Sequence, residues 1–317
     1  MRKLLAILLT CSLILCAACA LAEDDFNLAS LYKNRDTDPS WVEANAWHVT
    51  FADGAVTHDA GDRLRQDGTV VTLQAAGDWV LSGSWEGQIV ISVAAEENIH
   101  LILNGLTVTA ARGPALREDL ADKLILTLAP GTENAIVSKA EGLDGIDSAL
   151  YTEDDLSVNG GGSLSVTSAG HGIYCRADLI LASGTIRVVS GRDAVRGRNS
   201  VLLLDGTLDL QSGGDGLCAT RENKSDKGWM VLAGGSVKVL AGNGDPESGS
   251  QKDIKAITEL TVLGGTYDLT CADDGVRADQ IRISGGHFTI DTGDEPIQAT
   301  TTLHIENAVL DVTSHKD

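Results

Sequence analysis

A three-residue motif recurs along the 317-residue chain at an interval of about 22 residues. Each copy has a polar, a small and an aliphatic residue, and the copies at His171, Asp193 and Asp215 lie 22 residues apart. The six copies are Asp144-Gly145-Ile146, His171-Gly172-Ile173, Asp193-Ala194-Val195, Asp215-Gly216-Leu217, Asp274-Gly275-Val276 and Glu295-Pro296-Ile297. A unit this short cannot bury its own apolar side chains, so the units must stack to form a core.

Between the motifs, apolar and polar residues alternate on both sides of glycine turns, as in residues 179–188 and 281–290. Alternation at period two buries one face of a strand. The two patterns predict an all-β parallel β-helix with coils of about 22 residues and a strand spacing of roughly 4.8 Å. The expected internal aliphatic ladder contains Ile173, Val195, Leu217 and Val276. A leucine-rich horseshoe would need its own leucine pattern, and a β-sandwich would not explain the repeated motif.

The first 22 residues have the pattern of a signal peptide. Arg2 and Lys3 precede the apolar run 4–19, and Ala20-Leu21-Ala22 precedes an acidic stretch. This pattern predicts cleavage near Ala22 and a secreted or cell-surface protein, with a lipoprotein anchor at Cys19 as the alternative. After this segment, no apolar stretch is long enough to predict a transmembrane helix.

Residues 23–68 lack the repeat, which is confined to residues 69–317. We expect residues 23–68 to form an N-terminal cap that shields the open edge of the first coil. A small partner-binding segment is the alternative for this region. Residues 69–317 are expected to form one parallel β-helix domain.

The formal net charge is −21, and loss of Arg2 and Lys3 with the signal peptide leaves −23. This balance argues against a nucleic-acid partner, which requires clustered lysine and arginine. An acidic exported protein is often simply soluble, but carboxylates can also hold a hard cation such as calcium. Beyond the signal peptide, Cys175, Cys218 and Cys271 are too few for a disulfide framework and are expected to fill core space.

Two insertions interrupt the repeat, at residues 221–228 and 243–253. Other units join the corresponding strands with only a few residues. Insertions in solenoids commonly build a binding face, although both segments could also be solvated loops without function.

Several segments carry a family resemblance: residues 87–91, 101–106, 126–134, 151–160, 215–228 and 273–276. On these segments the chain resembles the secreted, calcium-binding, carbohydrate-binding β-helix proteins of the clostridial pectin-binding type, which are structurally related to the family 9 pectate lyases. The resemblance covers residues 69–313. It implies a right-handed coil, calcium at acidic corners and binding of acidic polysaccharide such as polygalacturonate or pectin. Three triplets depart from the family's acidic corner pattern: His171-Gly172-Ile173, Lys255-Ala256-Ile257 and Glu295-Pro296-Ile297.

Stacking of the coils is expected to bring six aspartates toward one edge. Carboxylates repeated at roughly 4.8 Å repel one another unless a cation lies between them. Calcium prefers six to eight oxygen ligands and accepts backbone carbonyl groups as well. The predicted calcium ligands are Asp193, Asp215, Asp253, Asp273, Asp274 and Asp294. The alternative is that these residues serve only as turn formers.

The predicted carbohydrate-binding residues lie in and near the two insertions. Trp229 and Tyr267 are the candidate stacking platforms for sugar rings, and calcium would bridge the carboxylates of protein and ligand. The full set is Lys224, Lys227, Trp229, Lys252, Lys255, Tyr267 and Arg277.

Three functions compete on the sequence alone. The first is non-catalytic, calcium-dependent binding of acidic polysaccharide, which we favour. The second is a polysaccharide lyase acting by β-elimination, with Lys255 as the base and calcium as the electrophile. Nearby acidic residues would raise the pKa of Lys255 and weaken it as a neutral base. The third is a surface or adhesion scaffold without a sugar ligand. The oligomeric state is not predicted.

Overall fold

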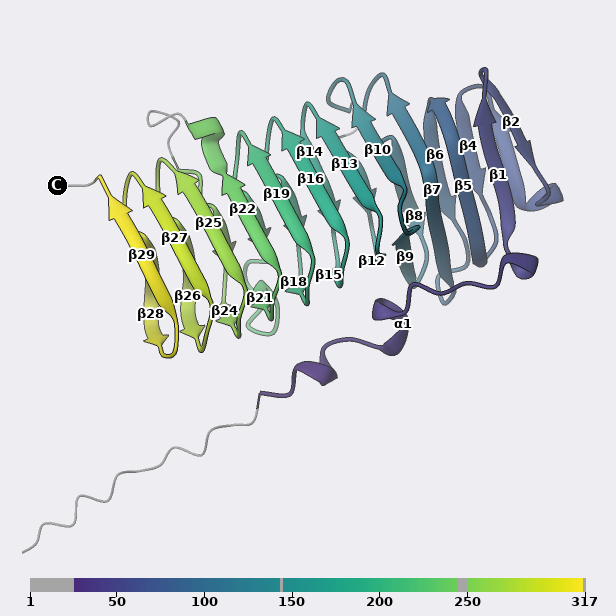
Figure 1. Ribbon diagram of the computed structural model, residues 1–317. Coiled ribbons are helices and arrows are strands. Elements are labelled where there is room, and N and C mark those ends of the chain that lie inside the picture. The colour runs from purple at the N-terminus through teal and green to yellow at the C-terminus, as the bar shows by residue number, and fades with distance from the viewer. Residues whose placement is uncertain (1–25, 143–144, 245–249, 316–317) are drawn as a thin grey trace, which may run out of the picture.

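The computed structural model describes residues 26–142, 145–244 and 250–315. The predicted signal peptide, with its alternative anchor Cys19, lies outside the described residues. The described part of the chain is all-β, and its 29 strands are joined in one continuous hydrogen-bonded sheet. Among the described strands, only β1 (Trp47–Ala52) with β2 (Ala55–His58) and β3 (Leu64–Asp67) with β4 (Val70–Leu73) pair antiparallel. All other pairs are parallel, as expected for stacked coils (Figure 1).

Each coil contributes strands to three faces of the solenoid, which we call the motif face, the second face and the third face. The motif face contains β6 (Gln88–Ser92), β8 (Leu116–Leu120), β11 (Ser148–Thr152), β14 (His171–Cys175), β17 (Val195–Gly197), β20 (Leu217–Ala219), β23 (Ile254–Ala256) and the first parts of β26 (Val276–Ile283) and β28 (Ile297–Ile305).

The second face follows the motif face along the chain. It contains β9 (Lys123–Leu128), β12 (Asp155–Gly160), β15 (Asp178–Leu181), β18 (Ser200–Leu203), β21 (Trp229–Leu232), β24 (Glu259–Val262) and the second parts of β26 and β28. The third face contains β10 (Glu133–Ser138), β13 (Ser163–Ser168), β16 (Thr185–Ser190), β19 (Thr207–Ser212), β22 (Ser236–Leu240), β25 (Thr266–Cys271), β27 (His287–Thr292) and β29 (Val309–Ser314). The longer strands β5 (Gly77–Glu86) and β7 (Asn98–Ala110) span the second and third faces of the first coils.

The predicted aliphatic ladder is confirmed and extended. Ile173 pairs with Val195, and Val195 pairs with Leu217. The ladder continues through Ile254 to Val276, and all five side chains are fully buried. Burial of these side chains between neighbouring coils sets the register of the motif face.

Two motif copies were aligned wrongly from the sequence. Ser148 pairs with His171, so Ser148-Ala149-Leu150 takes the place expected for Asp144-Gly145-Ile146, whose Asp144 lies outside the described residues. Likewise Leu217 pairs with Ile254, so Lys252-Asp253-Ile254 occupies the position expected for Lys255-Ala256-Ile257. The register follows the aliphatic residue that is fully buried, and Ile257 is only half-buried.

The N-terminal region divides into two parts with different positions. Strands β1 to β4 lie at the N-terminal end of the solenoid, where β1 pairs with β5 and β4 pairs with β6 (Figure 1). The preceding residues, 26–46, run past the second face instead. They contain η1 (Leu28–Ser30), α1 (Asn34–Thr37) and η2 (Glu43–Asn45). A further short helix, η3 (Gly61–Arg63), lies between β2 and β3. A cap over the first coil therefore describes only the later part of this region.

Residues 26–46 are attached to the second face by a buried ion pair. The Asp36 carboxylate accepts hydrogen bonds from Lys123 Nζ at 2.8 Å and from Ser157 Oγ at 2.5 Å. Nearby, Leu28 and Leu31 pack against an outward-facing apolar cluster that includes Leu202. This segment therefore covers the second face and leaves the motif face uncovered.

The three described cysteines are buried and form no disulfide, as the sequence predicts. Cys175 and Cys271 belong to the main core. Nowhere in the described residues does a helix reach the length and apolar character needed to cross a bilayer.

Candidate functional site

The two insertions flank the motif face on both sides. Residues 221–228 connect β20 to the second face, and the segment that begins with η4 (Ala241–Gly244) and ends at Asp253 connects the third face to β23. Residues 221–228 and η4 lie at opposite edges of the coil (Figure 1). Because both border β20 and β23, the fold makes this part of the motif face the candidate site.

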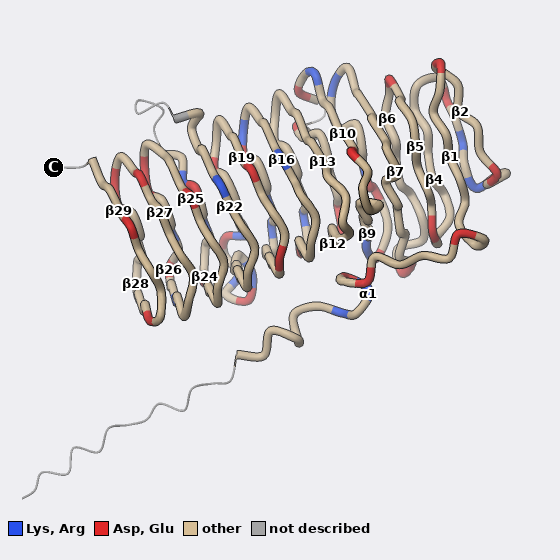
Figure 2. The backbone as a smooth tube through the Cα atoms, in the orientation of Figure 1, with Lys and Arg blue, Asp and Glu red and all other residues tan. Residues whose placement is uncertain are grey.

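Two rows of polar side chains run along the motif face from coil to coil. The acid row lies two residues before the aliphatic ladder and contains His171, Asp193, Asp215, Lys252, Asp274 and Glu295. The cation row lies one residue after the ladder and contains Tyr174, Arg196, Cys218, Lys255, Arg277 and Gln298. Oppositely charged residues also lie close together on the third face, as Lys238 of β22 and Asp268 of β25 do (Figure 2).

Ion pairs connect the two rows. Arg196 lies 3.4 Å from an oxygen of Asp193, and Arg277 lies 3.0 Å from an oxygen of Asp274. Between them, Lys255 Nζ lies 2.8 Å from an oxygen of Asp215. The sequence analysis expected calcium to relieve the repulsion within the aspartate row. In the fold, side chains from the neighbouring row already provide positive charge at three coils.

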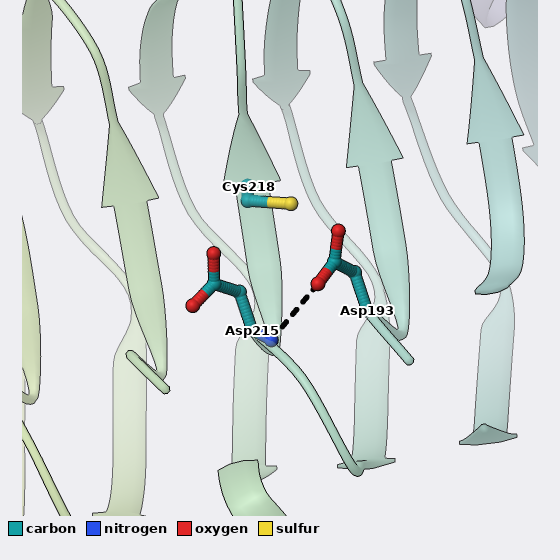
Figure 3. Close-up of side chains that lie close together, drawn as sticks. All are labelled: Asp193, Asp215 and Cys218. Atoms are coloured by element: carbon teal, nitrogen blue, oxygen red, sulfur yellow. Dashed lines mark hydrogen bonds between the residues drawn. The ribbon is translucent and has the colours of Figure 1, made fainter. Parts of the chain in front are cut away.

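The upstream cluster consists of Asp193, Asp215 and Cys218 (Figure 3). One Asp193 oxygen accepts the backbone N–H of Asp215 at 3.0 Å, and the other lies 3.3 Å from His171 Nδ1. Burial raises the pKa of Asp193, but His171 and Arg196 outweigh burial and hold that pKa below its ordinary value.

The other two groups of the upstream cluster are the hydrogen-bonded carboxylate of Asp215 and the buried thiol of Cys218. The Asp215 oxygens accept the backbone N–H of Lys252 at 2.9 Å and the Lys255 ammonium. Burial, with the charges of Asp193 and Asp215, raises the pKa of the Cys218 thiol well above its ordinary value. A protonated sulfur and occupied carboxylates do not form the oxygen-rich ligand set that calcium prefers. The upstream cluster therefore does not fit calcium.

The downstream cluster consists of Asp273, Asp274 and Asp294, which offer only oxygen atoms. Asp274 is 1% exposed, and its Oδ1 atom has no hydrogen-bond partner within the described residues. Burial and the charge of Asp273 raise the pKa of Asp274. A buried carboxylate oxygen without a donor, beside a second acid, is an arrangement that a hard cation would stabilise. The downstream cluster therefore fits calcium, although Lys252 also contacts Asp273.

Asp253 does not lie at the acidic edge, contrary to the prediction. It is fully buried and occupies the motif position held by Gly216 and Gly275 in neighbouring coils. A side chain there points inward, since a Cβ atom on Gly216 would lie 2.2 Å from the Val239 side chain. Burial raises the pKa of Asp253 well above its ordinary value, and the inward position of this side chain separates it from the predicted calcium ligands at the edge.

The two predicted stacking platforms are also misplaced. Tyr267 is 1% exposed, stacks on Phe288 with ring centroids 4.5 Å apart and donates its hydroxyl to the Gly264 carbonyl oxygen. Trp229 begins β21 on the second face, where it packs against the cluster that contains Leu202. Neither ring can stack on a sugar bound to the motif face. Strand alternation turns the Tyr267 ring into the core, and the coil corner places Trp229 on the second face.

The predicted basic residues are distributed over several environments. Lys255 and Arg277 lie in the cation row, whereas Lys252 is buried among Ser250 and Asp273. In the first insertion, Lys227 lies 3.5 Å from an Asp178 oxygen, and Lys224 is exposed.

The sequence analysis missed a group of arginines beside the cation row. Arg176, Arg196, Arg198 and Arg221 line two adjoining depressions on the motif face, together with Tyr174. The signal was present in the repeat, since Tyr174 and Arg196 occupy equivalent positions one coil apart. The recurring triplet contains only the residues before and at the ladder, so it does not indicate the positions after it.

Comparisons with known proteins agree with this architecture. Residues 67–246 and 243–296 match the profile of a family described as carbohydrate-binding domain-containing protein. A protein of that description from Acetivibrio thermocellus is 32% identical over 232 residues, covering 70% of this chain and 80% of the relative. A solved structure of a polysaccharide lyase-like protein from C. thermocellum, a gadolinium derivative, superposes with a TM-score of 0.67 at 20% identity. That similarity covers 84% of this chain and all of the other, and it concerns the fold alone. On the profile match and the sequence identity, this chain belongs to the family of carbohydrate-binding domain-containing proteins.

Proposed function

We propose that this protein binds an acidic polysaccharide on its motif face without cleaving it. The observation that carries the proposal is the row of cationic side chains, Arg196, Lys255 and Arg277, which the coils present between two insertions on a chain of net charge −21. Guanidinium and ammonium groups are the natural partners of sugar carboxylates. Membership of a carbohydrate-binding family supports the same class of ligand.

We propose that calcium strengthens this binding from the downstream cluster. Asp273, Asp274 and Asp294 would hold the ion, and their all-oxygen donor set and the unpaired Asp274 Oδ1 support the assignment. Bound calcium supplies positive charge that can bridge carboxylates of protein and ligand. Asp193, Asp215 and Asp253 are left out of this calcium site for the reasons given above.

The lyase alternative requires Lys255 to act as a neutral base. Burial lowers the pKa of Lys255, but the charge and hydrogen bond of Asp215 outweigh burial and raise that pKa above its ordinary value. An ammonium group paired at 2.8 Å cannot accept the proton removed in β-elimination. This pairing favours binding over cleavage. Release of unsaturated oligouronides by the wild type, lost in Lys255→Ala, would reverse that preference.

We also propose that the protein is exported and acts outside the cell or at its surface. The charge and apolar pattern of residues 1–22 supports this proposal. An extracellular location suits a polymeric ligand that cannot enter a cell. Fractionation of the producing cell would place the protein in the medium or envelope if the proposal holds, and in the cytoplasm if it does not.

The direct test is co-sedimentation of the mature protein with insoluble polygalacturonate, first in calcium and then in a chelator. We expect strong binding in calcium and weaker binding after chelation. Arg277→Ala should reduce binding, whereas Arg282→Ala should not, because Arg282 lies on the same strand but pairs with Thr261 on the second face. Absence of wild-type binding under every condition would refute the proposed ligand class.

A further inference from the structure

We propose that the motif face carries a second site for acidic sugar chains, which works without calcium. We call it the arginine groove and define it by Tyr174, Arg176, Arg196, Arg198, Arg221 and Lys224. The inference rests on the proposed function, because it assumes that the ligand is an acidic polysaccharide. It goes further by assigning residues and a mode of recognition that differ from those of the downstream cluster.

The groove consists of two adjoining depressions that share Arg196 and Arg198. The first has a volume of about 520 Å³ and lies between these arginines and the insertion residues 220–224. The second has a volume of about 500 Å³ and extends over β11 and β14 toward Tyr174 and Arg176. Because they share two lining residues and extend over several coils, the two depressions suit a chain molecule more than a compact ligand.

Two of the groove's arginines are held in position by neighbouring side chains. Arg176 places one nitrogen 2.9 Å from both Glu153 oxygens. Arg196 donates to Thr220 Oγ1 at 3.1 Å, and its guanidinium lies 4.8 Å from the Tyr174 ring centroid. A stacked and hydrogen-bonded guanidinium loses little freedom when a ligand binds, so these residues form a preorganised floor.

The other three cations are not neutralised within the protein. The side chains of Arg198, Arg221 and Lys224 make no hydrogen bond or ion pair with any described residue. Glu222 is the only carboxylate among the residues that line the first depression. These three positive charges outnumber the single carboxylate of the first depression, so they repel one another and attract an anion. On a chain of net charge −21, this local excess of positive charge indicates a binding site for oxyanions.

The spacing of the arginines indicates a polymer with one anionic group on each repeating unit. Arg176 and Arg198 directly follow Cys175 and Gly197, which pair across adjacent coils, so they lie one strand spacing apart, roughly 4.8 Å. A sugar ring has a length of the same order. A uronate chain lying parallel to the solenoid axis could thus present successive carboxylates to successive arginines, each able to form two parallel hydrogen bonds.

The arginine groove and the downstream cluster lie in different coils. The groove spans β11 to β20, whereas Asp273, Asp274 and Asp294 flank β26 and β28. Chelation should therefore remove one contribution to binding and leave the other. This separation allows each site to be tested without the other.

The test is calorimetric titration of the mature full chain with oligogalacturonate, in calcium and in a chelator. The double variant Arg198→Ala/Arg221→Ala removes two unpaired cations, and Arg282→Ala is the matched control on the second face. We expect wild type and control to retain binding in the chelator. The double variant should bind there roughly tenfold more weakly or worse. Thermal unfolding should change little among the three proteins, because these side chains make no hydrogen bond or ion pair with any described residue.

The outcomes separate the two proposals. Wild-type binding that vanishes completely in the chelator would overturn the arginine groove and leave the calcium-dependent function standing. Equal binding of wild type and double variant in the chelator would also overturn the groove. No wild-type binding in either condition would overturn the proposed function itself.

Three further ligands test which anionic group the arginine groove binds. Fully methyl-esterified pectin, which lacks the charge, should not bind in the chelator, and binding would overturn recognition by arginine. A sulfated galactan tests whether sulfate can replace carboxylate. Weaker binding of oligogalacturonate or of the sulfated galactan by Arg198→Ala/Arg221→Ala than by wild type supports the groove. Tighter binding of single-stranded DNA than of either polymer would overturn assignment to a sugar ligand.

Discussion

The upstream and downstream clusters begin from the same sequence motif and reach opposite electrostatic states. In the upstream cluster, both oxygens of Asp193 and of Asp215 have close polar contacts, and Lys255 reaches Asp215 from the adjacent row. In the downstream cluster, Asp274 keeps one buried oxygen without a donor, although Arg277 contacts the other. The comparison shows that an Asp-Gly corner becomes a candidate metal site only where neighbouring coils fail to supply enough hydrogen-bond donors.

The largest expected effect comes from breaking the upstream pair. Lys255→Met leaves the charge of Asp215 buried and unpaired, which should lower the free energy of unfolding by about 3 to 4 kcal/mol. Urea denaturation at neutral pH measures this loss. The double variant Asp215→Asn/Lys255→Met should recover most of the stability, because no unpaired charge then remains.

An exposed pair provides the control for this prediction. Lys238 lies 3.6 Å from Asp268 on the third face, and both side chains are largely solvent-exposed. Lys238→Met should therefore change the free energy of unfolding by less than about 0.5 kcal/mol. Similar losses for Lys255→Met and Lys238→Met would show that the upstream cluster is not stabilised by its buried cation.

Another buried carboxyl on the motif face sharpens the comparison, because no cation among the described residues contacts it. Glu118 is fully buried, accepts the backbone N–H of Asp154 at 3.0 Å and leaves Oε1 without a partner in the described structure. Burial raises the pKa of Glu118 to about 7. The folded protein therefore holds this proton between pH 4.5 and 7, where the unfolded chain has lost it, so stability falls as pH rises through this window.

The contribution of Glu118 should amount to about 3 kcal/mol between pH 4.5 and 7. This contribution is measured by comparing the unfolding free energies of wild type and Glu118→Gln at several pH values. The difference between the two proteins should shift in favour of Glu118→Gln as pH rises. A difference that stays constant with pH would mean that Glu118 is already ionised in the folded protein.

The smallest expected effect separates the two clusters by their response to calcium. At a calcium concentration 100 times the dissociation constant, the folded protein should gain about 2.7 kcal/mol of stability. Asp274→Asn should abolish this gain, and Asp193→Asn should retain it, because only the downstream cluster offers an unpaired oxygen. Thermal unfolding of each variant with and without calcium measures this gain. A gain that is retained in Asp274→Asn and lost in Asp193→Asn would place the metal site in the upstream cluster.

The sequence predicted the site unevenly. The structure places Asp193, Asp215 and Asp274 along one edge, as expected, because residues two positions before the buried aliphatic residue keep that place in every coil. Calcium binding stays a prediction for Asp274, and the contacts of Asp193 and Asp215 do not fit it. Asp253 was wrong because an insertion of uncertain length precedes it, and a shift of three residues moves a side chain from the edge into the core. Tyr267 was wrong because an aromatic residue near a glycine turn can lie on either side of its strand.

What the sequence determined by itself is the stacked-coil architecture. A repeat of 22 residues with alternating apolar positions has one economical way to bury its aliphatic residues, and that constraint is local and periodic. Only the tertiary structure decided which charges meet. Asp215 and Lys255 are 40 residues apart, and their contact depends on the register that the coils adopt across both insertions. Ion pairing and unpaired oxygens result from that register, so the difference between a neutralised cluster and a candidate cation site arises only when the coils stack.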